Sequence, residues 1–143
     1  MLPIADKINI FLKEVIGTPY KFHGRDLTGL DCYGLCILYY RYIFNIELYD
    51  WNYSLTDCRM HNLASKNYFD AGFSYTNSLH KLSIHDIILF KNKSEKFNTP
   101  HMAVYLGNEE YLHILINEKV KISLIDNYFR LHFLGILRRE SWV

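Results

Sequence analysis

The sequence predicts an α+β fold, with helices in the N-terminal half packed on an antiparallel sheet formed by the C-terminal half. Residues 4–44 carry apolar side chains at helical spacing, whereas residues 84–137 carry short β-rich runs separated by turn residues. The chain has 143 residues, and we expect a single domain over residues 1–143. Half of the residues are apolar and 22% are charged, a composition that argues against intrinsic disorder.

The first predicted element is an amphipathic helix over residues 4–15. Its apolar residues recur at the spacing of one helical face: Ile4, Ile8, Phe11, Leu12 and Val15. Pro3 suits the first turn, and Gly17 suits the position just after the last one. Residues 18–31 break the pattern with Pro19, Gly24 and Gly29, so we expect a long irregular loop. Such loops in a compact domain are usually functional.

A second helix is predicted from Cys32 to Phe44. It is apolar almost all round, which is typical of a buried central helix, and Asn45 suits a left-handed stop. A weaker helix is predicted over residues 56–69. The predicted strands follow: Ile84–Lys91, His101–Leu106, Tyr111–Ile116, Val120–Ile125 and Phe133–Leu137.

Composition also excludes several kinds of partner. Sixteen Lys and Arg against fifteen Asp and Glu give a net charge of +1, without the basic surplus that nucleic-acid binding needs. No apolar run is long enough for a membrane span, and the N-terminus lacks the pattern of a signal peptide. The seven His and three Cys form no zinc-binding motif, so we expect no metal.

The first candidate for chemistry is Cys32, which would begin the central helix. The positive end of a helix dipole favours a thiolate and so predicts a lowered thiol pKa, with Asp31 as the N-cap. Cys36 is four residues further on, and Cβ atoms at that spacing lie roughly 5–6 Å apart, too far for a disulfide. A structural, buried cysteine is the alternative for Cys32, and it is the preferred interpretation for Cys36 and Cys58.

The second candidate is the pair His101 and His113, predicted on neighbouring strands. A three-residue loop over Asn108–Glu110 would place both imidazoles on the same face of the hairpin, whereas a one-residue slip would separate them. One histidine could then act as a base and the other could orient it. Two ordinary surface or hydrogen-bonded imidazoles are the alternative.

A cysteine at a helix start, then a histidine opening a strand, then a polar orienter on the next strand is the papain-like order. The sequence also resembles the NlpC-type cell-wall cysteine peptidases. The matching stretches are Gly17–Tyr20, Gly29–Leu35, Asp86–Phe90, His101–Asn108 and Tyr111–His113. They follow the order of the family and cover almost the whole chain from Gly17 onward.

The resemblance implies that Cys32 is the nucleophile, His101 its base and His113 the residue that orients His101. It further implies substrate contacts for Tyr20 and Asp31, and no cofactor. The implied activity is hydrolysis of amide bonds in peptidoglycan peptides, as a γ-D-glutamyl or cross-link endopeptidase working through a thiolate–imidazolium pair. A papain-like amidase or acyltransferase acting on a non-wall substrate is an alternative.

Three positions depart from the family pattern. Tyr33 stands where the family commonly has Ser, and we expect its ring to line the substrate pocket. His23 and His85 stand where the family commonly has Gly. A bulky residue after the nucleophile resembles the phage tail-tip branch of the family, which implies a virion component made in the host cytoplasm. Its partners would be other phage tail proteins, and a purely structural tail-tip subunit is the alternative.

Overall fold

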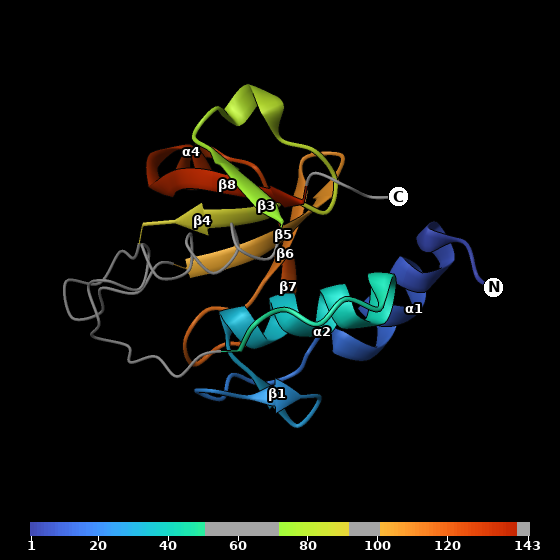
Figure 1. Ribbon diagram of the computed structural model, residues 1–143. Helices are drawn as coiled ribbons and strands as arrows, with labels where there is room; N and C mark the ends of the chain where they lie inside the picture. The colour runs from blue at the N-terminus through green and yellow to red at the C-terminus, as the bar shows by residue number, and fades with distance from the viewer. Residues whose placement is uncertain (51–71, 92–100, 140–143) are drawn as a thin grey trace.

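Two helices and a small hairpin from the N-terminal third lie on one side of a sheet formed by described residues between 73 and 139 (Figure 1). The computed structural model describes residues 1–50, 72–91 and 101–139. Its elements are α1 (Ile4–Val15), β1 (Arg25–Asp26), β2 (Gly29–Leu30), α2 (Cys32–Phe44), β3 (Phe73–Thr76), the 3₁₀ helix η1 (Leu79–Lys81), β4 (Ile87–Phe90), β5 (His101–Gly107), β6 (Glu110–His113), β7 (Lys121–Leu124), α4 (Asn127–His132) and β8 (Phe133–Arg139).

This architecture confirms the predicted α+β class and both N-terminal helices. The five predicted strands are present with shifted ends, and the loop over residues 18–31 contains the β1–β2 hairpin. The helix predicted over residues 56–69, and Cys58 with it, lie outside the described residues. Besides the β1–β2 hairpin, β3, η1 and α4 were not predicted. Helix α4 has six residues, too few for a helical period to show in the sequence.

Helix α2 is the centre of the molecule. The side chain of Asp31 caps it by accepting a hydrogen bond from the Gly34 amide at 2.7 Å. It ends at Asn45, which has the predicted left-handed conformation with φ 55° and ψ 37°. Because α1, β1 and β5 all pack against it, eight of its residues are buried: Tyr33, Gly34, Leu35, Cys36, Ile37, Tyr39, Tyr40 and Ile43.

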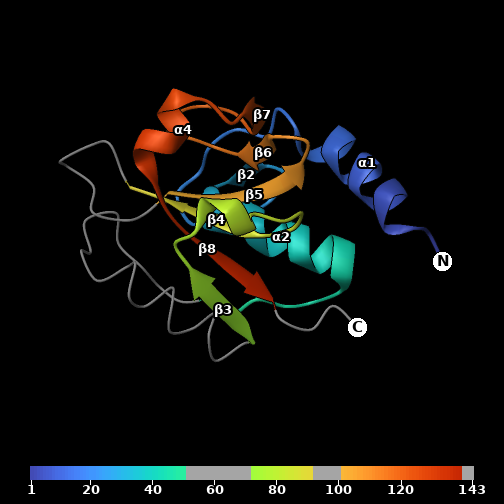
Figure 2. The same cartoon turned by 90° about the horizontal axis from the view of Figure 1, so that it is seen from above.

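The main sheet has six antiparallel strands in the order β3-β8-β4-β5-β6-β7. Figure 2 shows α2 beneath the sheet and α4 at the side of β7. The main core lies between α2 and one face of the sheet, while Ile88, Phe90 and Phe129 belong to a smaller cluster on the other face. Strand β4 is buried on both faces, which explains its continuous apolar sequence.

The turn between β5 and β6 differs from the predicted three-residue loop Asn108–Glu110. Only Asn108 and Glu109 lie outside the strands, with left-handed φ values of 53° and 62°. A two-residue turn alone would place His101 and His113 on opposite faces of the hairpin. The strand pairing, however, shifts between Tyr105 and Gly107, and this β-bulge returns them to one face. The two candidate histidines therefore share a face, as predicted, through a different turn.

Candidate active site

Cys32 is the first residue of α2, and its thiol is free. The backbone amides of Tyr33 and Met102 both donate hydrogen bonds to its sulfur. Met102 belongs to β5 and directly follows His101. The packing of α2 on β5 thus brings the predicted nucleophile to the strand end that carries the predicted base.

The environment of Cys32 opposes ionisation of the thiol. Burial and, next, the negative charge of Asp31 raise its pKa to about 12, against smaller lowering effects of the two amides and Arg25. The predicted lowered pKa is therefore wrong. The residue that caps the helix places its own negative charge beside the sulfur, and desolvation outweighs the helix dipole. The resting site holds a thiol.

His101 and His113 form a hydrogen-bonded pair, with His101 Nε2 3.1 Å from His113 Nδ1. His113 is 4% exposed. Burial lowers the pKa of His101 to about 3 and that of His113 to about 4, and the positive charge of Lys121 acts in the same direction on both. Both imidazoles are neutral at pH 7, so the predicted thiolate–imidazolium pair is not the resting state.

A fourth polar group, Ser123 on β7, continues this row. Its Oγ lies 2.7 Å from His113 Nε2. Sequence reasoning missed it because a serine in a strand gives no signal by itself. The register that places Ser123 opposite Tyr111, two residues from His113, is a property of the folded sheet.

Tyr20 lies beside the thiol, as the resemblance implies. Burial raises the pKa of its phenol, and the nearby Cys32 and Asp31 raise it further, so the hydroxyl stays protonated. Its backbone is fixed by a 3.0 Å hydrogen bond from its amide to the Glu118 carbonyl. Contact between the Tyr20 hydroxyl and substrate stays a prediction.

Asp31 does not fit the predicted contact with substrate, because it is 2% exposed and both of its oxygens are bonded within the chain. Oδ1 accepts from the Gly34 amide and from Arg25 Nη1 at 2.8 Å, and Oδ2 accepts from the His23 amide at 2.9 Å. Its predicted role as the N-cap is confirmed. Arg25, which sequence reasoning missed, also binds Asp50 through Nε and Nη2, each at 3.0 Å.

Tyr33 is 1% exposed, so the structure argues against its predicted place in the substrate pocket. Its hydroxyl donates to the Tyr49 carbonyl, and the Arg25 guanidinium lies over its ring, 5.6 Å from the centroid. Successive residues of a helix point about 100° apart, so the residue after the half-buried Cys32 can face the protein interior. Tyr33 fastens the segment after α2 to the loop before it.

The loop before α2 packs very tightly against the helix. A Cβ at Gly34 would lie 2.1 Å from the Gly24 carbonyl oxygen, a separation that forbids any side chain there. His23 has a left-handed φ of 59°, and His85 has one of 77°. At these two positions the family that the sequence resembles commonly has Gly. The left-handed backbone conformation accounts for that preference, because Gly adopts it without steric cost.

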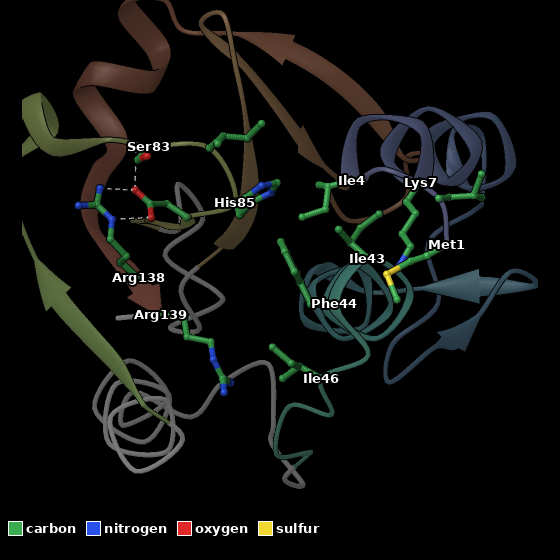
Figure 3. Close-up of a pocket in the computed structure, with 13 residues that line it drawn as sticks. Met1, Ile4, Lys7, Ile43, Phe44, Ile46, Ser83, His85, Arg138 and Arg139 are labelled. Atoms are coloured by element: carbon green, nitrogen blue, oxygen red, sulfur yellow. Dashed lines mark hydrogen bonds and ion pairs between the residues drawn. The ribbon is translucent and has the colours of Figure 1, made fainter. Parts of the chain in front are cut away.

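A cavity of about 790 Å³ lies at the opposite end of α2, away from these residues. Figure 3 shows Ile4 of α1 and Ile43 and Phe44 of α2 around it, opposite His85. None of the predicted site residues lines it. Within the described residues, no group of three or more His, Cys, Asp or Glu is placed to hold a metal ion. None of the described helices is long and apolar enough to cross a membrane.

Solved structures share this fold. An NlpC/P60 family protein from Bacillus cereus has a TM-score of 0.69 at 22% identity, covering 98% of this chain and 41% of its own. RipD from Mycobacterium tuberculosis, a non-catalytic NlpC/p60 domain protein with a peptidoglycan-binding function, has a TM-score of 0.62 at 17% identity, covering 99% of this chain and 100% of its own. The predicted papain-like fold is confirmed.

Two curated proteins are similar in sequence. LytE of Bacillus subtilis, described as a probable peptidoglycan endopeptidase, is 27% identical over 127 residues, which is 88% of this chain. The chain spans only 32% of the length of LytE. NlpC of Escherichia coli, described as a probable endopeptidase, is 25% identical over 122 residues, 85% of this chain and 69% of that protein. The NlpC/P60 family model matches residues 17–138, and the chain therefore belongs to the NlpC/P60 family.

Proposed function

We propose that this chain is a cysteine peptidase that hydrolyses amide bonds in the peptides of peptidoglycan. The observation that carries the proposal is the convergence of Cys32, His101 and His113 from three separate elements, α2, β5 and β6. The similarity to LytE and NlpC supports the class of substrate. The bond cleaved, γ-D-glutamyl or cross-link, belongs to the same proposal.

From this arrangement we infer a role for each nitrogen of the His101 ring. His113 occupies Nε2 of His101, so Nδ1 of His101 takes the proton of the Cys32 thiol. The sulfur then attacks the amide carbonyl carbon, and the resulting oxyanion develops near the N-terminal end of α2. His101 then gives the proton to the amide nitrogen, and the C–N bond breaks. The amine departs, and the acyl group remains on Cys32 as a thioester. Water attacks that thioester with His101 as base, which releases the acid and restores the thiol.

The neutral resting state has a mechanistic consequence. The raised pKa of the Cys32 thiol and the lowered pKa of the His101 imidazole both disfavour proton exchange before substrate arrives. We therefore infer that proton transfer accompanies attack on the carbonyl. Tyr20, beside the sulfur with its proton retained, is placed to donate a hydrogen bond to the substrate.

We further propose, from the resemblance alone, a setting in a phage tail tip with other tail proteins as partners and the virion as location. The resemblance to the phage tail-tip branch rests on Tyr33 as the bulky residue after the nucleophile, and the burial of its ring gives no support to its expected place in the substrate pocket. A non-catalytic role is the second candidate, since RipD is a non-catalytic NlpC/p60 domain protein. The pairing of two neutral imidazoles next to a free thiol favours the enzyme.

Digestion of purified muropeptides, with products resolved by mass spectrometry, tests the proposal. The wild-type protein should convert a peptide into two fragments whose masses sum to the parent plus one water. Cys32→Ala should give no fragments. Cys36→Ala is the matched control, because it removes a buried thiol one turn further along α2 and should leave the same products. Intact muropeptides after incubation with wild-type protein would contradict the assigned function.

A further inference from the structure

The hydrogen-bonded row that begins at His101 does not stop at His113. Ser123 Oγ lies 2.7 Å from His113 Nε2, and the Ser123 side chain also hydrogen-bonds the Tyr111 hydroxyl. Tyr111 and Ser123 are directly paired across β6 and β7, and His113 is two residues from Tyr111 on the same strand. The side chains of all three therefore project from one face of the sheet.

The direction of this row decides whether His101 can act as a base. To accept the Cys32 proton, Nδ1 of His101 must be unprotonated, so its single hydrogen lies on Nε2 and is donated to His113 Nδ1. His113 then carries its own hydrogen on Nε2. His113 is 4% exposed, so that N–H needs a protein acceptor, and the Ser123 oxygen is the atom in place.

The reverse direction gives an inactive base. If Ser123 donated to His113 Nε2, His113 would donate from Nδ1 to His101 Nε2. The hydrogen of His101 would then lie on Nδ1, where no lone pair remains for the Cys32 proton. Both directions satisfy every hydrogen bond of the two imidazoles, and only one of them supports catalysis.

We propose that Ser123 is a positioning residue for His101: it accepts the Nε2–H of His113 and so holds the tautomer in which His101 can receive the Cys32 proton. The inference rests on the proposed function, because the base role of His101 is part of it. The hydrogen of Ser123 is then donated to the Tyr111 oxygen, which completes the row. When His101 becomes an imidazolium during the reaction, its Nε2–H already has an acceptor and no heavy atom must move.

The first test uses the pair Ser123→Val and Ser123→Thr, which have the same shape and differ in one hydroxyl. Two-bond nitrogen–hydrogen NMR couplings in protein labelled with ¹⁵N-histidine report which nitrogen of each ring is protonated. Wild type and Ser123→Thr should show His113 protonated on Nε2. Ser123→Val should lose most of that population, and an unchanged His113 tautomer in Ser123→Val would overturn the proposal. Ser123→Ala gives the same comparison should valine disturb the strand.

The second test is kinetic, on the muropeptide cleaved by the wild type. Loss of one buried hydrogen bond predicts a fall of about tenfold in kcat for Ser123→Val. KM should not change, because Ser123 contacts the row and not the substrate, and Ser123→Thr should regain most of the rate. A raised KM with unchanged kcat would overturn the role. A wild-type protein without hydrolysis would refute the proposed function, while the tautomer measurement would still decide the role of Ser123.

Discussion

At the N-terminal end of α2, His101 is hydrogen-bonded through its ring to His113, and the strand that carries His101 contacts the Cys32 thiol through the Met102 amide. Toward the C-terminal end of α2, several hydrogen bonds converge on one residue, His85. There, Tyr39 Oη lies 2.6 Å from His85 Nδ1, and the Tyr40 hydroxyl donates to the His85 carbonyl. The His85 amide donates in turn to the Tyr105 carbonyl at 2.8 Å. His85 is thus held in its left-handed conformation by contacts on its backbone and its ring.

The difference between the two ends lies in which protons can move. Burial lowers the pKa of the imidazole at both ends, so histidine is neutral in both places. At the N-terminal end the neutral imidazole lies near a thiol with a transferable proton. At the other end its partner is a buried tyrosine, whose pKa is raised by burial. A histidine with a shifted pKa is therefore a candidate for catalysis only when a group that can give it a proton lies beside it.

The largest expected effect is a loss of activity in variants at the N-terminal end of α2. Cys32→Ala and His101→Ala should each lower kcat/KM at least about 10³-fold, because each removes a group that transfers the proton or forms the bond. His113→Asn should lose less, since it orients the base and transfers no proton. Kinetics on the cleaved muropeptide measures all three. A His101→Ala variant more active than His113→Asn would mean that the two histidines have exchanged roles.

The next effect concerns stability near the C-terminal end of α2. Asp86 is 1% exposed and is bound by Arg138 through Nε at 2.8 Å and Nη2 at 2.6 Å. Arg138→Met leaves that carboxylate buried without its charge partner, and the free energy of unfolding should fall by about 3 kcal/mol. Urea titration measures it, and kcat at low temperature should not change.

Arg41→Met is the matched control for that variant. Arg41 binds Glu47 with comparable geometry, at 2.5 and 2.9 Å, but both side chains are largely exposed. Its loss should change the free energy of unfolding by at most about 0.5 kcal/mol. If Arg138→Met and Arg41→Met lowered the free energy of unfolding equally, the burial of Asp86 would not explain the effect of Arg138→Met.

The N-terminal end of α2 was the more predictable of the two. Asp31 before the helix and Asn45 after it are local signals, and both ends of α2 follow from them. The three proposed catalytic residues were named from their order along the chain. Their pKa values could not be predicted, because burial and the contact of Asp31 with the thiol exist only in the folded protein.

Residues whose roles depend on strand register or loop packing were missed or misplaced. Ser123 joins the row through the pairing of β6 with β7, and Arg25 reaches Asp31 only because the loop folds back on the helix. Tyr33 was expected in the pocket because it follows the nucleophile. Tyr33 is next to Cys32 in the sequence, but the turn of the helix directs its side chain into the protein interior.

A further effect is the response of stability to acid. An unfolded histidine has a pKa of about 6.5, whereas the pKa values of His101 and His113 in the folded chain are about 3 and about 4. Between these values the unfolded chain binds more protons, so their contribution to stability is complete above about pH 6.5 and is lost as the pH falls toward 3. Unfolding free energies measured from pH 7 to pH 4 should decline, and less steeply for His113→Asn. Equal slopes would contradict a neutral, buried His113.

A modest effect is expected from Tyr39→Phe. It removes the hydroxyl bound to the half-buried His85 and should lower the free energy of unfolding by about 1 kcal/mol without changing kcat/KM. Thermal unfolding and the muropeptide assay measure the two quantities. A loss of activity in Tyr39→Phe would couple the two ends of α2 and contradict their separation.

The most direct test of the account is to trap the covalent intermediate. Wild-type protein mixed with excess muropeptide, quenched in acid within the first turnover and digested, should yield the Cys32 peptide with the acyl part of the substrate attached as a thioester. Cys32→Ala should give no adduct and no cleavage, and Cys36 should remain unmodified in the wild type. Cleavage that continues in Cys32→Ala, or an adduct on another residue, would contradict the assignment of Cys32 as the nucleophile.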